Sequence, residues 1–199
     1  MRARFALPPH APGLKIGLFG GSFNPPHEGH RAASLLALHR LGLDSVWWLV
    51  SPANPLKDPR DLASLPMRIA AARAIARHPR IEVTGIEAEI AARYTYQTIR
   101  YLTRRCPGVR FVWIMGADNL AKFHRWQRWR EIAATVPIAV VDRPGSTLAA
   151  TQAGAAVALA RYRRSQARAF AMQRPPAIIF LYGPRSTLSS TALRAPQAA

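Results

Sequence analysis

The alternation of two kinds of segment constrains this chain more than any other feature. Short, almost wholly apolar runs, such as SVWWLV at residues 45–50, alternate with longer segments in which apolar residues recur every three or four positions. The runs predict strands, and the spaced segments predict helices. Strands that alternate with helices form βαβ units, whose strands lie parallel in one sheet. The chain is therefore expected to adopt an α/β fold with a mainly parallel sheet.

The expected elements fill most of the 199 residues. Strands are predicted at residues 15–20, 45–50, 81–86, 109–115, 137–141 and 177–182, and helices at 28–41, 65–77, 96–105, 126–134, 149–162 and, as a short element, 189–194. Residues 1–14 contain three prolines and no periodicity, so a flexible arm is expected there. Because no linker divides the rest, residues 15–199 are expected to form a single domain.

Cysteine content and hydropathy indicate the cellular compartment in which the chain is expected to work. The lone cysteine, Cys106, excludes an internal disulfide and a multi-cysteine metal site. No apolar run approaches the length of a membrane span, and Arg2 and Arg4 are not followed by the apolar core of an export signal. We therefore expect a cytoplasmic protein with no membrane partner.

The charge balance is unusual for a globular chain. Lysine and arginine number 28 against 10 acidic residues, which gives a net charge of +18. Such a field favours anionic partners such as nucleotides or nucleic acid. The composition of a GC-rich genome explains the excess of arginine equally well, and both readings stay open. The basic residues are dispersed along the chain, which argues against a basic tail.

The loop after the first predicted strand carries residues suited to phosphate. Gly20, Gly21 and Gly29 would let a ligand approach the backbone closely. His27 and His30 stand three positions apart at the start of the next helix, so both imidazoles can face one way. The free N–H groups of a helix N-terminus suit phosphate, and imidazoles can donate further hydrogen bonds to it. The segment has neither the Gly-Lys-Ser/Thr of a Walker A loop nor the spacing of a helical zinc motif.

The segment GSFNPPHEGH (residues 21–30) resembles the G-x-F-x-P-x-H-x-G-H signature of the nucleotidylyltransferase superfamily. The resemblance implies a Rossmann-like, doubly wound sheet with helices on both faces, and transfer of a nucleotidyl group to a phosphate oxygen with release of pyrophosphate. It also implies that His27 and His30 bind the triphosphate and stabilise the transition state. Asn24 stands where many members have Asp, and it adds no negative charge. The ATP-binding positions implied in this loop are Gly20, Gly21, Ser22, Phe23, Asn24 and Gly29.

The segment SSTALR near the end of the chain matches a second motif of that superfamily, S-S-T-x-x-R. Hydroxyls, free N–H groups and a guanidinium can together hold a triphosphate. Alone, such a serine cluster would more often cap a helix. The resemblance assigns Ser189, Ser190 and Thr191 to ATP binding and Arg194 to catalysis.

Three middle segments bear on the acceptor. Asn54 and Lys57 could reach a phosphate, although a polar turn accounts for them equally well. Thr95 can cap a helix, where the N–H group of Tyr96 would suit a carboxylate. In GADNLAKFHRWQRW (residues 116–129), a carboxylate could take ribose hydroxyls and a tryptophan could stack on an electron-poor ring. Of Trp126 and Trp129, at least one is expected to be partly exposed because polar residues surround them, although tryptophans more often pack in a core.

Together these segments resemble the bacterial nicotinate-nucleotide adenylyltransferase family, with its Y-T-x-x-T, G-A-D, H-R-W and R-P-G segments. The resemblance implies that Thr95 and Tyr96 recognise the nicotinate carboxylate, that Trp126 stacks on the pyridine ring and that Gly116 and Asp118 hold adenosine. It extends the acceptor-binding set to Asn54 and Arg143, and it makes Lys57 a catalytic cation.

The expected reaction joins ATP and nicotinate mononucleotide to give nicotinate adenine dinucleotide and pyrophosphate. Mg²⁺ is expected to ride on the triphosphate, with no metal ligands supplied by the chain. A monomer or a homodimer is expected. The alternatives are nicotinamide mononucleotide or phosphopantetheine as acceptor, or CTP as donor. A basic nucleic-acid-binding protein is the alternative of another class, disfavoured because no stacking motif or zinc-finger spacing is present.

Overall fold

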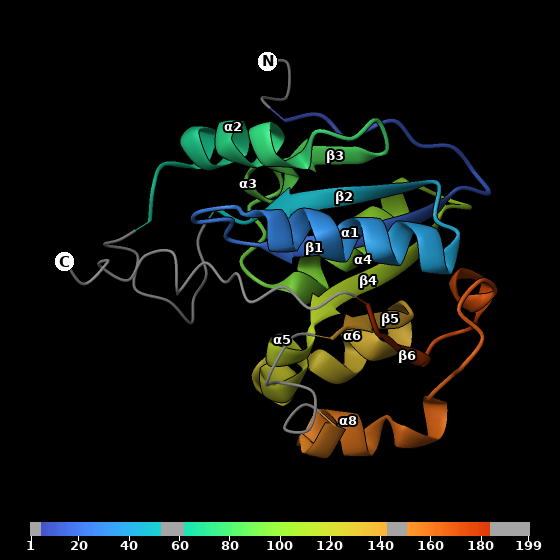
Figure 1. Cartoon of the computed structure of the whole chain (residues 1–199). Coiled ribbons are helices and arrows are strands. Elements are labelled where there is room, and N and C mark those ends of the chain that lie inside the picture. The colour runs from blue at the N-terminus through green and yellow to red at the C-terminus, as the bar shows by residue number, and fades with distance from the viewer. Residues whose placement is uncertain (1–4, 53–61, 143–150, 184–199) are drawn as a thin grey trace.

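Within the described residues 5–52, 62–142 and 151–183 of the computed structural model, six parallel strands form one sheet (Figure 1). The strands are β1 (Lys15–Gly21), β2 (Ser45–Val50), β3 (Ile81–Thr84), β4 (Arg110–Gly116), β5 (Ile138–Val141) and β6 (Ile178–Leu181). They pair in the order β3-β2-β1-β4-β5-β6. The order reverses between β1 and β4, and ligands of doubly wound sheets bind at the carboxyl ends of strands beside such a switch point. The predicted α/β class is confirmed.

Helices connect the strands on both sides of this sheet. They are α1 (Glu28–Leu41), α2 (Leu65–Ala76), α3 (Ile86–Glu89), α4 (Thr95–Arg105), α5 (Ala117–Lys122), α6 (Trp129–Thr135) and α8 (Gly154–Ala158), with short 3-10 helices η2 (Phe123–Arg125), η3 (Ala160–Tyr162) and η4 (Phe170–Met172). The helix α1 has the predicted bounds and ends at Gly42, whose φ of 60° is left-handed and suits glycine.

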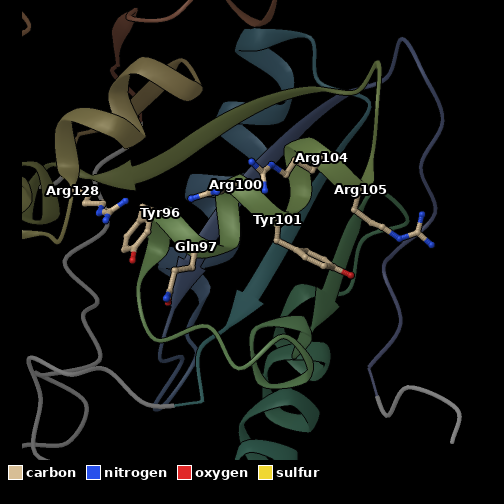
Figure 2. Close-up of a pocket in the computed structure, with 7 residues that line it drawn as sticks. All are labelled: Tyr96, Gln97, Arg100, Tyr101, Arg104, Arg105 and Arg128. Carbon is tan, nitrogen blue, oxygen red and sulfur yellow. The ribbon is translucent and has the colours of Figure 1, made fainter.

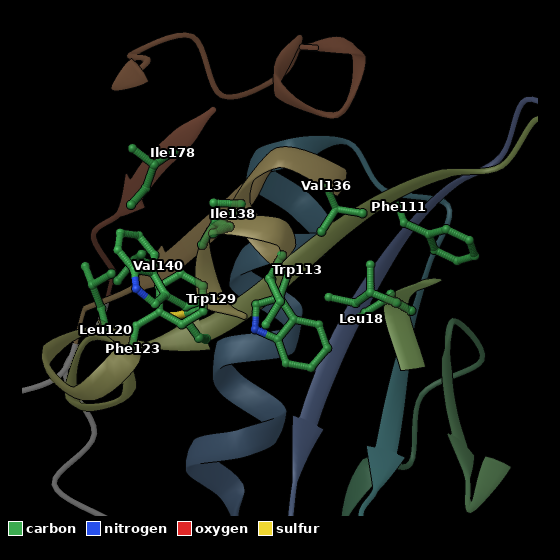
Figure 3. Packing of buried hydrophobic residues seen from close by; sticks show 14 of the residues in the cluster. Leu18, Phe111, Trp113, Leu120, Phe123, Trp129, Val136, Ile138, Val140 and Ile178 are labelled. Atoms are coloured by element: carbon green, nitrogen blue, oxygen red, sulfur yellow. The ribbon is translucent and has the colours of Figure 1, made fainter. Parts of the chain in front are cut away.

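Alternating side chains of the strands divide the core into two clusters, one on each face of the sheet. On one face, Trp48 of β2 packs with residues of α1 and α2. On the other face, Trp47 of β2 and Trp113 of β4 pack with residues of α3 to α6 and α8. Figure 3 shows Trp113 in this cluster, together with Leu120 of α5 and Trp129 of α6. Leu18 of β1 lies level with both Trp47 and Trp113. Different helices therefore cover the two faces of the sheet and flank its carboxyl edge.

Several predicted bounds need correction. The helix expected at 126–134 begins at Trp129, because Trp126 is extended and Arg128 is left-handed with φ of 53°. The strand expected at 81–86 ends at Thr84, since α3 follows it. Only part of the helix expected at 149–162 is found, as α8 and η3, and its first two residues lie outside the described residues. The helices α3 and α5 have four and six residues, too few to show a period in the sequence.

The part of the expected N-terminal arm that the structure describes lies against the domain. Phe5 donates its backbone N–H to Glu89 Oε1 at 3.0 Å, and Thr84 Oγ1 donates to the carbonyl of Ala6 at 3.2 Å. Leu7 and Leu14 pack on the core of the α4 side. Among the described residues, no helix is both long and apolar enough to span a membrane.

Candidate functional site

The carboxyl end of β1 is closed on one side by an indole. A Cβ added to Gly20 would lie 2.5 Å from Cη2 of Trp113, which is too close for any larger residue. The absence of a side chain at Gly20 is thus explained by packing against β4. At Gly21, an added Cβ would meet the ring of Phe23 at 3.4 Å, which is ordinary contact. Trp113 therefore lies against the last residues of β1, just before the loop that precedes α1.

An aromatic cluster fixes the loop between β1 and α1. Phe23 is buried, and its ring stacks on Trp48 of β2 with centroids 4.8 Å apart. Its φ of 46° is uncommon for a residue with a side chain, and such strain persists only where surrounding contacts hold it. The same ring lies 4.9 Å from the imidazole of His30. Phe23 thereby joins the floor of the loop to the first turn of α1.

The two predicted histidines lie together at the N-terminus of α1, with ring centroids 3.8 Å apart. His27 is buried and precedes the helix, whereas His30 is half-buried in its first turn. The backbone N–H of His27 donates to Nδ1 of His30 at 3.2 Å. Because Nδ1 accepts this bond, neutral His30 carries its proton on Nε2 and can donate it to an anion. The helix itself is held on the sheet by Ser34, whose Oγ accepts a 2.7 Å bond from Trp48 Nε1.

A buried arginine that the sequence analysis did not single out ties together the loops of this edge. The guanidinium of Arg68 in α2 donates to the carbonyls of Ser22, Ser51, Pro52 and Ala63 at 2.7–3.0 Å. Only 2% of Arg68 is exposed, and this burial lowers its pKa. One side chain therefore joins the loop after β1, the loop after β2 and the segment before α2.

The sequence did contain a signal for this role. Arg68 lies on the same stripe of α2 as the buried residues Ile69, Ala72 and Ala76. A charged residue on the apolar stripe of a helix must be hydrogen-bonded inside the fold, because an unpaired buried charge is costly. An arginine in that position could have been identified as a buried structural cation.

The G-A-D segment lies where β4 meets α5. Gly116 is buried and precedes the first turn of α5, in an extended conformation. Asp118 is exposed in that first turn. The segment thus lies next to β1 at the switch point of the sheet, where Asp118 faces solvent.

The start of α4 holds the predicted carboxylate-binding pair, and its cap differs from the prediction. Thr95 is the first helical residue, not the cap, which is Tyr94. The side chain of Gln97 accepts the backbone N–H groups of Arg93 and Tyr94 at 2.9 and 3.1 Å. Gln97 is thus the side chain that fixes this turn. Its own backbone N–H donates to the carbonyl of Tyr94 at 3.0 Å, which leaves the N–H groups of Thr95 and Tyr96 at the start of the helix.

Trp126 is half-buried and Trp129 is buried, which confirms that one of the two is partly exposed. The ring of Trp126 makes edge contacts with Trp113 at 6.2 Å and with Phe123 at 5.4 Å. Two residues later, the Arg128 guanidinium lies over the ring of Tyr96 at 4.9 Å. These contacts place the Trp126 segment beside the start of α4.

A buried carboxyl side chain from α3 is hydrogen-bonded to the start of α4. Glu87 of α3 is 7% exposed, and its Oε1 accepts a 2.8 Å bond from Oγ1 of Thr98, which is fully buried. Burial raises the pKa of Glu87 to about 7, although the bond from Thr98 opposes that rise. The pair links α3 to the turn of α4 that follows Thr95 and Tyr96.

The candidate residues are therefore connected through the two faces of the sheet. His30 contacts Phe23 on the α1 side, while Trp113 links Gly20 to Trp126 on the α4 side. The remaining candidates lie outside the described residues: Asn54, Lys57, Arg143, Ser189, Ser190, Thr191 and Arg194. Within the described residues, no group of three or more His, Cys, Asp or Glu side chains is placed to hold a metal ion.

Comparisons with known proteins agree on one family. The cytidylyltransferase-like family model matches residues 18–196. A curated relative from Bradyrhizobium sp. (strain ORS 278), named as a probable nicotinate-nucleotide adenylyltransferase, is 60% identical over 185 residues, which cover 92% of this chain and 96% of the relative. A protein of the same name from Methylorubrum extorquens (strain PA1) is 57% identical over 183 residues, covering 91% and 99%.

Solved structures share the fold at much lower identity. Plasmodium falciparum nicotinic acid mononucleotide adenylyltransferase complexed with APC superposes with a TM-score of 0.66 and 14% identity, covering 91% of this chain and 82% of that one. The same protein complexed with NaAD gives a TM-score of 0.65 at 14% identity, with the same coverage. At this identity the likeness shows the architecture of the sheet and its helices.

Proposed function

The chain belongs to the cytidylyltransferase-like family and, within it, to the nicotinate-nucleotide adenylyltransferases, and we propose how its own residues carry out that family's reaction. The enzyme transfers the adenylyl group of ATP to nicotinate mononucleotide. The products are nicotinate adenine dinucleotide, a precursor in NAD biosynthesis, and pyrophosphate. The observation that carries the proposal is the pair of imidazoles at the N-terminus of α1, beside the switch point of the sheet.

The reaction is an in-line displacement at phosphorus. An oxygen of the acceptor's 5′-phosphate forms a bond to the α-phosphorus of ATP, and the bond from that phosphorus to the α,β-bridging oxygen breaks. Pyrophosphate leaves with the electron pair of that bond. Two polyanions must meet, so Coulomb repulsion opposes assembly. Positioning and charge stabilisation are therefore the main catalytic contributions, and no nucleophilic side chain is needed.

His27 and His30 stabilise the charge that develops on the phosphates. The Nε2–H bond of His30 points away from the hydrogen bond that Nδ1 accepts from the backbone N–H of His27. The first turn of α1 adds N–H donors and partial positive charge. Because Phe23 and Trp48 hold the loop rigidly, these donors need little reorganisation during the reaction.

Further cations and hydroxyls complete the triphosphate site in this proposal. Lys57 and Arg194 act as catalytic cations, and Ser189, Ser190 and Thr191 bind the β- and γ-phosphates. These assignments rest on the SSTALR match and on the position of Lys57 after β2. The residues Gly20, Gly21, Ser22, Phe23, Asn24 and Gly29 line the ATP side, with Ser22 held in place by its bond to Arg68. Gly116 and Asp118 take the adenosine, since the Asp118 carboxylate is exposed next to β4.

The acceptor lies on the α4 side of the sheet. The first N–H groups of α4, at Thr95 and Tyr96, suit the nicotinate carboxylate. Trp126 offers a half-buried ring to the pyridine, with its edges supported by Trp113 and Phe123. Asn54 and Arg143 complete the acceptor set by the same family resemblance.

Magnesium enters with ATP in this proposal. The donors placed at the described part of the site are imidazoles and backbone N–H groups, which fit phosphate oxygens and not a bare cation. Mg²⁺ is hard and prefers phosphate oxygens and water, so it supplies charge neutralisation on the triphosphate. A cytoplasmic location and a monomeric or homodimeric state stay predictions.

The test is pyrophosphate release with Mg-ATP, comparing nicotinate mononucleotide with nicotinamide mononucleotide at equal concentration. Strong release with the acid alone would support a carboxylate-reading role for Thr95 and Tyr96. Release that favours the amide would overturn this role while keeping the transfer chemistry. Release with neither acceptor would contradict the proposed function.

A further inference from the structure

An open pocket of about 480 Å³ runs along the exposed face of α4 (Figure 2). Two rows of side chains spaced four residues apart line it, Tyr96–Arg100–Arg104 and Gln97–Tyr101–Arg105, and Arg128 closes one end. We call this pocket the α4 groove. Its volume falls in the range of small-molecule sites.

The groove concentrates positive charge that the sequence shows only as dispersed arginines. Among the residues that the structure describes, its lining contains four arginines and no acidic residue. Arg128 pairs with Glu131 at 3.3 Å. Within the described residues, no carboxylate lies within ion-pair distance of Arg100, Arg104 or Arg105. Three guanidiniums are therefore available to an anion from solvent.

Helix stability explains only part of this arrangement. Cations in the last turn of a helix interact favourably with its dipole, which accounts for Arg104 and Arg105. Arg100 lies in the middle of α4, where a like charge four residues away at Arg104 is unfavourable. An anion bound between the two would relieve that repulsion.

The arginine end of the groove is separate from the proposed active site. The helix α4 packs on the opposite face of the sheet from α1, which carries His27 and His30. Arg104 lies eight residues beyond Tyr96, which corresponds to about 12 Å along the helix axis. Only the Tyr96 end borders the acceptor position.

We propose that the arginine end of the α4 groove binds a small phosphate-rich anion, namely an inorganic polyphosphate or the phosphate chain of a nucleotide. Guanidinium groups match phosphate oxygens in bidentate geometry, and several of them along one helix suit a chain of phosphates. The hydroxyl of Tyr101 can donate a further hydrogen bond.

The surface suits a small molecule better than single-stranded nucleic acid. Nucleic acid would need aromatic faces on which successive bases stack. One face of Tyr96 is stacked by Tyr94 at 6.2 Å, and the Arg128 guanidinium lies over its ring at 4.9 Å. The groove therefore offers charge without a run of free stacking platforms.

The test is a titration of the full enzyme with tripolyphosphate at fixed ionic strength. The active site is first filled with α,β-methylene-ATP and nicotinate mononucleotide, whose binding is measured separately, so a failure of the proposed function is seen on its own. We expect one additional equivalent of tripolyphosphate to bind. In the double variant Arg104→Gln/Arg105→Gln, its Kd should rise at least tenfold. GTP in place of tripolyphosphate distinguishes the two sources, because tighter binding of GTP would identify a nucleotide.

The matched control removes the same charge elsewhere. Arg73 and Arg168 are exposed and lie outside the α4 groove. The double variant Arg73→Gln/Arg168→Gln should bind tripolyphosphate within twofold of the unmodified enzyme. An equal loss of tripolyphosphate affinity in both double variants would show that net charge alone drives binding, and it would overturn the proposed site. Failure to bind an additional equivalent would overturn it too, as would tighter binding of a single-stranded oligonucleotide that the groove variant loses.

Discussion

The two helical layers of this enzyme hold their candidate residues in different ways. On the α1 and α2 side, hydrogen bonds add to the ring stacking of Phe23 on Trp48 in fixing the loop: His27 to His30, Trp48 to Ser34, and Arg68 to carbonyls of three segments. On the α4 and α6 side, Tyr96 and Trp126 are half-buried and are held by ring contacts.

This difference matches two chemical tasks. Groups that stabilise charge in a transition state act best when they are already fixed, because reorganisation then costs little. A surface that recognises a flat acceptor can tolerate adjustment, since ring contacts are broad in geometry. Changes in the loop on the first side should therefore affect folding and turnover, and changes in the exposed rings on the second side should affect acceptor affinity.

The largest effect on stability is expected at Arg68. Replacing it by Met keeps the aliphatic stem but leaves carbonyls of Ser22, Ser51, Pro52 and Ala63 without their buried donor. Hydrogen bonds to charged groups contribute about 1.5–3 kcal/mol each, so Arg68→Met should lower the free energy of unfolding by at least about 3 kcal/mol. Urea denaturation measures this change.

The control for Arg68 lies on the same helix. Arg73 of α2 is exposed, and Arg73→Met should change the free energy of unfolding by less than about 0.5 kcal/mol. If Arg68→Met unfolded at the same urea concentration as Arg73→Met, the buried cation would not be the tie that joins the loops.

The second-largest effect is a pH dependence of the free energy of unfolding, which arises from Glu87 on the α4 side of the sheet. Burial raises the pKa of Glu87 from 4.5 to about 7, so the folded protein binds this proton more tightly than the unfolded chain does. Protonated Glu87 therefore makes its full contribution to the free energy of unfolding below pH 4.5. That contribution, about 3 kcal/mol in all, is lost as the pH rises to about 7. Glu87→Gln should remove that loss while keeping an acceptor for Thr98.

Urea denaturation at pH 5 and pH 8 measures this prediction. The free energy of unfolding of Glu87→Gln, relative to the unmodified enzyme, should be higher at pH 8 than at pH 5. Glu82→Gln is the control, because Glu82 is only half-buried and lies on β3. A relative stability of Glu87→Gln that is equal at both pH values would show that the carboxyl is not buried in this way.

The smallest effect is expected at Trp126. Loss of one aromatic contact is worth about 0.5–1.5 kcal/mol, so Trp126→Ala should raise KM for nicotinate mononucleotide about two- to tenfold. Steady-state kinetics should show kcat nearly unchanged, and Trp126→Phe should stay close to the unmodified enzyme. A fall in kcat at unchanged KM would place Trp126 with the transfer machinery instead.

Much of the fold could be predicted from the sequence because most strands are continuous apolar runs and the longer helices have regularly spaced apolar residues. The strands β1, β2 and β4 are apolar runs beside clear loop residues, and α1 ends at a glycine, so their bounds follow within one residue. The helix α3 could not be predicted, since four residues show no period. The start of α6 was missed because Arg128 adopts a left-handed conformation that only tertiary contacts can select.

The candidate site shows the same limit. His27 and His30 could be placed from their spacing at a helix start, because local geometry decides it. Arg68, Glu87 and the arginines of α4 could not be grouped with their partners, since those contacts join segments distant in the chain. Only an arginine on the apolar stripe of α2 gave a signal.

The catalytic role of the α1 imidazoles is tested by the single-turnover rate of adenylyl transfer in His30→Ala, with folding checked by circular dichroism. Removal of a fixed donor to transition-state charge should slow transfer on the order of 10²–10³-fold. His30→Gln, which keeps an N–H donor, should recover part of this loss, and His39→Ala at the exposed end of α1 should transfer at the unmodified rate. A folded His30→Ala enzyme that transfers as fast as the unmodified one would contradict the central role of the α1 imidazoles.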